Sequence, residues 1–206
     1  MASYPDIYVI RHGQTEWNVV NRYQGHLDSP LTNLGRAQAL AVGRTLLREL
    51  GHHPDLSAFT SPQGRAADSA ALILGDLGLS AKTDERLQEI AFGRWEGLTL
   101  EKILSGWPDK AAMAATEPFL WHFQAPGGER LAALKTRCRA FLKDLSGPSI
   151  VVTHGVTSRM LRGIWLGLED RETAMLPGGQ GVIYHLGAAC GHRAIKTDAF
   201  APSLNG

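Results

Sequence analysis

The sequence predicts an α/β protein, a three-layer α/β/α sandwich in which helices cover both faces of a mainly parallel sheet. Short apolar runs without alternating polar residues are typical of strands that are buried on both faces. Stretches with apolar side chains at helical spacing lie between these runs. A chain of 206 residues has the length of one domain, so we expect a single domain over residues 1–206.

Five short runs are candidates for the strands of this sheet. They cover residues 7–10, 56–60, 150–153, 182–186 and 193–200. The first run is apolar throughout and rich in strand formers, as is typical of a central strand. The run at 193–200 has the weakest pattern, and it is either a strand or a loop.

Four longer stretches show the apolar spacing of helices. Helices are expected over residues 32–50, 66–77, 129–145 and 156–165. Thr32 can cap the amino end of the first helix, and Gly51 can end it. Strands and helices therefore alternate along most of the chain.

Residues 98–128 interrupt this alternation. The segment contains Trp107-Pro108, Pro118 and Pro126, and its periodicity is weak. We expect short helices and loops that form a lid-like insertion over one end of the sheet. The aromatic run at 118–123 predicts that this lid presents an apolar surface to a ligand.

The composition excludes several classes of function. Lys and Arg total 21 against 20 for Asp and Glu, so no strong overall field would attract nucleic acid or a membrane surface. The first residues lack a basic leader, and no apolar run is long enough to span a bilayer, so we expect a cytoplasmic protein. Cys138 and Cys190 lack metal-ligand spacing, and we expect both to be buried thiols.

Two of the expected strands end in the same dipeptide. His12-Gly13 follows the strand at 7–10, and His154-Gly155 follows the strand at 150–153. Ligands of open α/β sheets bind at the carboxyl ends of the strands, so the two histidines are expected to meet there.

Positive charge is expected at the same edge. Arg11 precedes His12, and Arg65 follows the strand at 56–60 at the start of a helix. The helix that begins after His154 adds free backbone amides, which favour an anion. A phosphate group is the ligand that these residues predict. A metal ion held by the two histidines is the rival interpretation, but no second ligand pair at metal-binding spacing accompanies them.

Six segments, in this order, resemble the histidine phosphatase superfamily, the phosphoglycerate-mutase-like proteins. The segments are RHGQTEWN (11–18), GHLDSPLT (25–32), TSP with Arg65-Ala66 (60–66), LQE with FGRWEG (87–97), PGGE (126–129) and THG (153–155). The resemblance implies that His12 is a nucleophile that becomes phosphorylated and that Glu89 is the proton donor. The implied catalytic residues are His12, Glu89, His154, Arg11 and Arg65, and the implied phosphate-binding residues are Asn18, Gln24, Gly25 and Gly155.

Elementary chemistry is consistent with these roles. An imidazole attacks phosphorus only when it is neutral, so a hydrogen bond, expected to a backbone carbonyl, must hold the proton on the other ring nitrogen of His12. Arg11 and Arg65 can stabilise the in-line transition state without a metal or cofactor. We expect a bound phosphate dianion to favour the protonated form of Glu89.

Three functions remain as alternatives. Relatives that are mutases carry Glu-Arg-His-Tyr-Gly where this chain has Glu-Ile-Ala-Phe-Gly (89–93), Ser or Thr in place of Gln24, and a longer and more basic insertion than 98–128. These differences favour hydrolysis of a small phosphomonoester, with inorganic phosphate as product. A cofactor-dependent phosphoglycerate mutase is the first alternative, and a phosphate-binding module without turnover is the second. A homodimer is left open.

Overall fold

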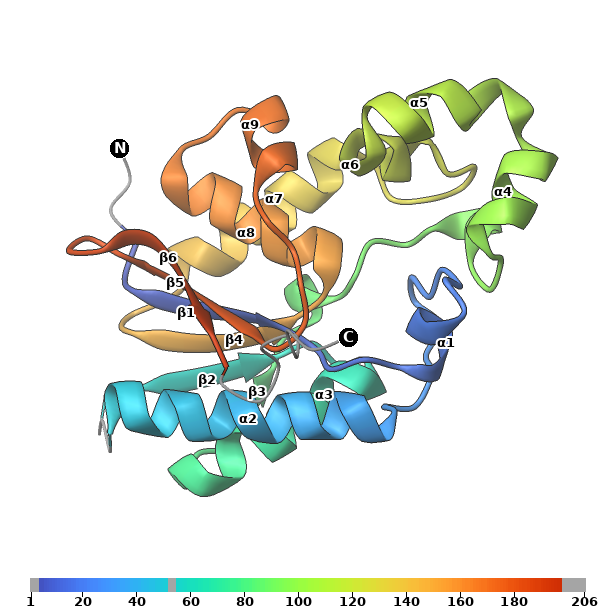
Figure 1. Ribbon diagram of the computed structural model, residues 1–206. Helices are drawn as coiled ribbons and strands as arrows, with labels where there is room; N and C mark the ends of the chain where they lie inside the picture. Colours follow the sequence, from blue (N-terminus) through green and yellow to red (C-terminus); the bar gives the residue numbers. More distant parts are fainter. Residues whose placement is uncertain (1–3, 52–54, 198–206) are drawn as a thin grey trace, which may run out of the picture.

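A central sheet organises the molecule. The computed structural model describes residues 4–51 and 55–197, and within these ranges six strands form one sheet in the order β3-β2-β4-β1-β5-β6 (Figure 1). The strands are β1 (Ile7–Arg11), β2 (Ser57–Thr60), β3 (Lys82–Thr83), β4 (Ser149–Thr153), β5 (Val182–Gly187) and β6 (Gly191–Lys196). Neighbours from β3 to β1 are parallel, whereas β5 runs antiparallel to β1 and β6. The predicted α/β class with a mainly parallel sheet is confirmed.

The expected strands agree closely with the observed ones. The ends of β1, β2, β4 and β5 each lie within one residue of the predicted ends. The strand expected over 193–200 is β6, which begins two residues earlier and ends at Lys196; residues 198–200 lie outside the described residues. The two-residue strand β3 was not predicted, because a pair of exposed residues carries no hydrophobic pattern.

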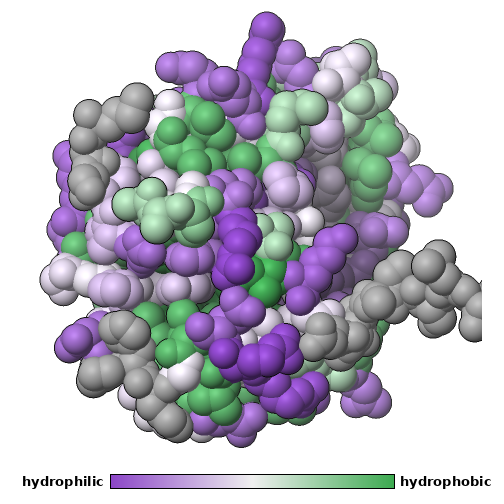
Figure 2. All heavy atoms as spheres, turned by 60° about the vertical axis from the view of Figure 1, so that its left-hand side comes forward, coloured by the Kyte–Doolittle hydropathy of each residue, from purple (hydrophilic) through white to green (hydrophobic). Residues whose placement is uncertain are grey.

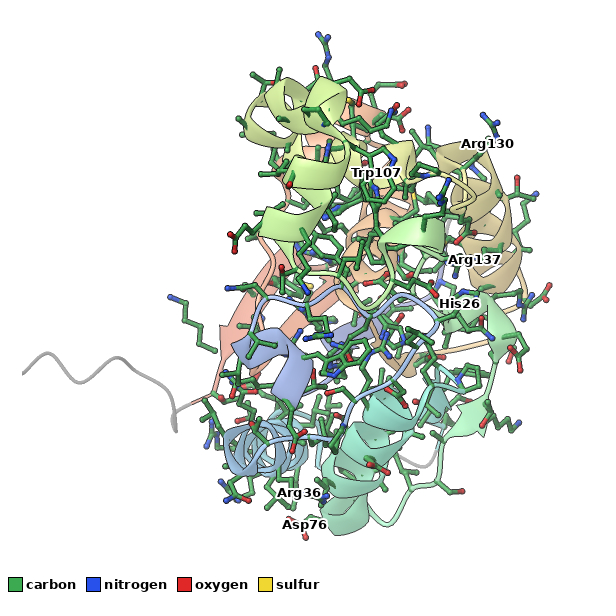
Figure 3. All side chains as sticks on the ribbon, turned by 90° about the vertical axis from the view of Figure 1, so that its right-hand side faces the viewer. His26, Arg36, Asp76, Trp107, Arg130 and Arg137 are labelled. Atoms are coloured by element: carbon green, nitrogen blue, oxygen red, sulfur yellow. The ribbon has the colours of Figure 1, made fainter. Side chains whose placement is uncertain are left out.

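Helices cover the sheet on both sides. The helices α2 (Asn33–Leu50) and α3 (Gly64–Leu74) lie on one face, and α7 (Leu131–Lys143) and α8 (Gly155–Leu166) lie on the other (Figure 1). In Figure 3, Arg36 and Asp76 mark the first layer, and Arg130 and Arg137 mark the second. Outside residues 98–128, the other helical segments of the described chain are α1 (Glu16–Val19), η1 (Gly75–Leu77), η2 (Glu85–Leu87), η3 (Gly93–Trp95) and α9 (Asp170–Met175).

Strand β1 shows why its sequence is apolar without alternation. Ile7 and Val9 pack into the core beneath α7 and α8. Tyr8 and Ile10 point the other way, into the core beneath α2 and α3. Both faces of the strand are therefore removed from water, which favours apolar side chains at every position.

The helix boundaries follow from local capping. The Oγ1 atom of Thr32 accepts a hydrogen bond from the backbone N–H of Gly35 at 3.0 Å, which caps α2 as predicted. Gly51 ends the same helix with a φ of 60°. The helix expected over 66–77 is α3, whose last turn tightens into the 3-10 segment η1.

Residues 98–128 form a chain of short helices beyond the carboxyl ends of the central strands (Figure 1). They are α4 (Leu100–Gly106), η4 (Pro108–Lys110), α5 (Ala111–Thr116), α6 (Pro118–Trp121) and η5 (His122–Gln124). Phe119 and Trp121 are buried, and the ring of Trp121 stacks on Trp95 with centroids 4.4 Å apart. The prediction that this aromatic run faces a ligand is therefore wrong for its largest side chains, because they fasten the segment to the core.

The two cysteines differ in their exposure to solvent. Cys138 is buried as expected. Cys190 is exposed, so the expectation is wrong for this residue, which lies in the tight turn between β5 and β6.

Figure 2 shows hydrophilic side chains interspersed with small hydrophobic patches on the face that lies at the left of Figure 1. Among helices within the described ranges, none has the length and hydropathy needed to cross a bilayer.

Candidate active site

A cavity of about 590 Å³ opens at the carboxyl ends of β1 and β4. This volume is within the usual range for small-molecule sites. The residues predicted for the site that line it are Arg11, His12, Asn18, Gln24, Gly25, Arg65, Glu89 and Gly155. His154 does not line the cavity, and it lies directly behind His12 with the two ring centroids 5.2 Å apart.

The paired strands bring the two histidines together. Parallel pairing of β1 with β4 continues one residue beyond the strands, because the backbone N–H of His12 donates to the carbonyl oxygen of Thr153 at 2.9 Å. The Nε2 atom of His154 lies 2.7 Å from the Oγ atom of Ser61, which follows β2. Three neighbouring strand ends thus supply one edge of the site, as expected for a parallel sheet.

The ring of His12 is held in one tautomer. Its Nδ1 atom lies 2.7 Å from the carbonyl oxygen of Gly13, and a carbonyl oxygen can only accept, so Nδ1 carries the proton. Burial, with the positive charges of Arg11 and Arg65, holds the pKa of His12 well below its usual value. At neutral pH the ring is therefore uncharged, with its lone pair on Nε2.

The guanidinium of Arg65 is oriented by the loop at 25–28. Its Nη2 atom donates to the carbonyl oxygen of Gly25, and its Nη1 atom donates to the carbonyl oxygen of Leu27 and to Asp28. Its Nε atom is buried and lacks an acceptor within the described part of the chain. Of five N–H donors, the Nε donor and one on Nη2 are left for an anion.

Arg11 lies at the start of α8. An added Cβ atom at Gly155 would come within 3.5 Å of its Cζ atom, so the glycine brings the guanidinium close to the backbone of the helix. The Nε atom of Arg11 is buried and lacks a hydrogen-bond partner among the residues described. Burial lowers the pKa of Arg11 and nearby Glu89 raises it. An incoming phosphate would supply the missing acceptors.

Glu89 lies against the amino end of α8. Its Oε2 atom accepts from the backbone N–H of Val156, and its Oε1 atom accepts from the backbone N–H and the hydroxyl of Thr157, all at 3.1 Å. These donors fix the position of the carboxyl group at the edge of the cavity. The segment that carries Glu89 is itself fixed, because its backbone N–H donates to the side chain of Gln63 at 2.8 Å.

Asn18 and Gln24 also line the cavity. The Oδ1 atom of Asn18 accepts from the backbone of Thr15 and from the side chain of Gln180. The Nε2 atom of Gln24 donates to the hydroxyl of Thr15 at 2.9 Å, whereas its buried Oε1 atom has no partner in the described ranges. A flip of this amide keeps the bond to the hydroxyl, which can also donate, and frees the NH₂ group to bind an anion.

Several residues of the cavity were not predicted from the sequence. His122, Arg159, Arg162 and Tyr184 all line it. Burial, with the charge of Arg159, lowers the pKa of His122 to about 4, and burial lowers the pKa of Arg162 to about 10. A signal for the two arginines was present, since positions 155, 159 and 162 share one face of a helix.

Metal ligation has no candidate cluster in the described residues. No three His, Cys, Asp or Glu side chains lie close enough there to share an ion. Burial, with the charges of Arg65 and Arg11, also holds the pKa of His154 well below its usual value. The predicted independence of the reaction from metals remains a prediction.

Comparison with known proteins identifies relatives over most of the chain. A family model described as the histidine phosphatase superfamily (branch 1) matches residues 7–197. Phosphoserine phosphatase 1 of Hydrogenobacter thermophilus is 32% identical over 168 residues, which are 79% of this chain and 77% of the relative. The probable phosphoglycerate mutase GpmB of Salmonella paratyphi C is 32% identical over 170 residues, 79% of this chain and 75% of the relative.

Solved structures show the same architecture. The structure of mycobacterial glucosyl-3-phosphoglycerate phosphatase with VO3 matches with a TM-score of 0.75 and 30% sequence identity. The match covers 94% of this chain and 98% of that one. The similarity therefore extends over the sheet, its helices and the strand ends that carry the site.

Proposed function

Because the chain belongs to the histidine phosphatase superfamily (branch 1), we propose that it hydrolyses phosphomonoesters of small metabolites through a phosphohistidine at His12. The observation that carries this proposal is the state of the His12 ring. Its Nδ1 atom is held by the carbonyl oxygen of Gly13, and its Nε2 lone pair is free beside two arginines with unused donors. A neutral nucleophile in a cationic cavity is what phosphoryl transfer to nitrogen requires.

In the first step the Nε2 atom of His12 bonds to phosphorus, and the bond between phosphorus and the ester oxygen breaks. Arg11 and Arg65 stabilise the charge on the equatorial oxygens. The leaving oxygen takes a proton from Glu89. Since the second pKa of a phosphomonoester is about 6, a substrate bound as the monoanion can bring this proton to the carboxylate.

In the second step Glu89, now ionised, accepts a proton from water. The oxygen of that water bonds to phosphorus, the bond to His12 breaks, and inorganic phosphate leaves. Asn18 and Gln24, which line the cavity, would bind the phosphate through both steps, and His154 would support the ring of His12 from behind. The amides at the start of α8 hold the side chain of Glu89 in position for this step.

Hydrolysis is favoured over mutase chemistry by the residues around Glu89. A mutase must bind the carboxylate of a phosphoglycerate in two orientations and exclude water from the phosphohistidine. Here Ile90 and Ala91 follow Glu89, where mutases carry basic and polar residues. The relative named as a probable phosphoglycerate mutase keeps that activity as the second candidate.

The domain organisation, the cellular location and the partners of the enzyme are also proposals. Residues 98–128 would act as a fixed cover of a single domain, since Thr99, Leu100, Glu101 and His122 line the cavity. Two free thiols, Cys138 and Cys190, favour the reducing cytoplasm. The partners would be the phosphomonoester and inorganic phosphate, with nucleic acid and membranes playing no part and a homodimer as the candidate assembly.

The test is hydrolysis of p-nitrophenyl phosphate in the presence of a chelator. Turnover without added metal supports the proposal. Binding of inorganic phosphate without turnover would identify the protein as a phosphate-binding module instead. Efficient conversion of 3-phosphoglycerate that depends on 2,3-bisphosphoglycerate would identify a mutase.

A further inference from the structure

One face of α8 extends the cavity away from the phosphate cup, which is the part of the cavity lined by Arg11, His12, Arg65 and Glu89. Gly155, Ser158, Arg159 and Arg162 line the cavity and are spaced at i, i+3, i+4 and i+7. Side chains on a helix lean toward its amino end, which here is the end that holds Arg11 and Glu89. Arg159 therefore lies one helical turn beyond the phosphate cup and on the same wall.

The guanidinium of Arg159 is held in place without an acid. Its Nε atom donates to the carbonyl oxygen of Leu176 at 3.1 Å, and its Cζ atom lies over the ring of Phe119. Gly178 leaves room for it, because a Cβ atom at 178 would be 2.7 Å from Nη2. No carboxylate of the described chain pairs with Arg159, and its Nη donors have no acceptor there.

Arg162 differs from Arg159 although both are arginines on the same face. It is fully buried, its Nε and Nη2 atoms donate to the carbonyl oxygens of Ser158 and Pro177, and its Cζ atom lies 3.8 Å from the ring centroid of Tyr184. These contacts give Arg162 a structural role. Arg159 is the arginine of this face whose donors stay available.

The charges around Arg159 favour a second anion. Arg159 is close enough to Arg11 that its charge contributes to lowering the pKa of Arg11. Glu89 and Glu101 are the carboxylates among the described residues that line the cavity. Both oxygens of Glu89 are already bonded to the amino end of α8, and no ion pair joins Glu101 to Arg159 in the described part of the chain. A phosphate bound to Arg11 leaves the charge of Arg159 without a counter-ion.

We propose that Arg159 binds a carboxylate of the substrate, so that the site selects phosphomonoesters with a carboxylate close to the phosphorylated carbon. This inference rests on the proposed function and names its substrate class. Residues one turn apart on a helix are about 5–6 Å apart, which suits a carboxylate two carbons from the ester oxygen. The planar fork of an arginine matches a carboxylate with two hydrogen bonds.

The test compares O-phosphoserine with O-phosphoethanolamine, which differ by the carboxylate alone. For the native enzyme we expect kcat/KM to be about 10- to 100-fold higher for phosphoserine, the range of a charge-assisted hydrogen bond. In Arg159→Gln the ratio should fall to near one, and in Arg159→Lys it should lie in between. The control is Arg171→Gln, which removes an exposed cation that does not line the cavity and should keep the ratio.

Two results would overturn the inference. One is a native ratio near one. The other is an equal loss for both substrates in Arg159→Gln, which would make Arg159 a ligand of the phosphate. The lysine variant shows whether a loss comes from misfolding, because it keeps the charge and most of the side chain.

A binding measurement separates this inference from the proposed function. Calorimetry with His12→Ala, which cannot form the phosphoenzyme, gives the affinities of the two ligands without turnover. A preference for phosphoserine that depends on Arg159, together with no hydrolysis of either phosphoserine or p-nitrophenyl phosphate by the native enzyme, would refute the hydrolase but support the carboxylate site. Turnover with equal affinities would do the reverse.

Discussion

The carboxylate of Asp28 lies 2.9 Å from the Nη1 atom of Arg65, and it also accepts from the backbone N–H of the same residue. The side chain of Arg65 is 1% exposed, and that of Asp28 is 38% exposed. Asp28 therefore reaches from the surface to orient an arginine inside the cavity. The guanidinium presents its remaining donors because its other donors are occupied by the loop at 25–28.

Removing the charge of Asp28 should loosen this arrangement. We expect Asp28→Asn to lower kcat/KM for p-nitrophenyl phosphate about 10-fold, because Arg65 loses its charged partner. The free energy of unfolding should change by about 1 kcal/mol or less, since the carboxylate is partly solvated. Steady-state kinetics and urea unfolding measure the two effects.

The control for Asp28→Asn is Asp144→Asn. Asp144 pairs with Arg86 at the surface, and its side chain is 66% exposed. Both kinetics and stability should stay near the native values in this variant. Equal activity of Asp28→Asn and the native enzyme would show that Arg65 does not depend on its partner.

The loop that carries His12 depends on a close approach between two glycines. A Cβ atom at Gly13 would lie 2.3 Å from the carbonyl oxygen of Gly35, and one at Gly35 would lie 2.0 Å from that of Gln14. Gly13→Ala should therefore lower the free energy of unfolding by about 1–3 kcal/mol and displace the nucleophile. Urea unfolding measures the loss.

Gly75→Ala is the matched change for this prediction. Gly75 has a right-handed helical conformation, and a Cβ atom there meets nothing within 4 Å. The substitution should be neutral or stabilise the protein by up to about 1 kcal/mol. If Gly13→Ala were as stable as Gly75→Ala, the tight contact would be refuted.

Two buried histidines, His12 and His154, and the partly buried His122 should make the fold sensitive to acid. Burial, the largest cause for each, lowers the pKa of His12, His154 and His122, the last to about 4. As the pH falls below about 6.5, the unfolded chain binds protons at these positions and the folded chain does not. The free energy of unfolding is therefore highest above this pH and falls toward the lowered pKa values.

We expect a loss of several kcal/mol between pH 7 and pH 5, since each histidine contributes up to about 2 kcal/mol over this range. Urea unfolding at several pH values measures it. His122→Phe should show a smaller loss, because one of the three groups is gone. The same unfolding midpoint at pH 7 and pH 5 would contradict the neutral state of these rings.

The proton donor has its own prediction. Glu89→Gln should still bind inorganic phosphate but lower kcat about 100- to 10,000-fold, the usual contribution of general acid–base catalysis. Calorimetry and steady-state kinetics measure the two properties. Unchanged turnover in this variant would remove Glu89 from the mechanism.

Much of the fold could be predicted because both faces of the parallel strands are buried. The runs that became β1 and β4 are apolar for that reason. Thr32 and Gly51 mark the ends of α2 through capping. The short helices of residues 98–128 could not be placed in detail. Their packing depends on contacts distant in sequence, such as Trp121 on Trp95.

The site could be predicted in part. His12, Arg65 and His154 follow strands directly, so the rule for the carboxyl ends of strands brings them together. Arg159 and His122 reach the cavity from the middle of α8 and from η5, positions that no strand end predicts. The burial that keeps His12 and His154 neutral also needs the complete structure, because it comes from the layers above and below the sheet.

Trapping the phosphoenzyme tests the central role of His12 most directly. Glu89→Gln is mixed with a phosphomonoester that it accepts, quenched in alkali, and examined by peptide mass spectrometry and phosphorus NMR. We expect one phosphoryl group, stable to alkali and labile to acid, on the Nε2 atom of His12, and none after His12→Ala. A phosphoryl group on another residue, or undiminished hydrolysis by His12→Ala, would contradict the account.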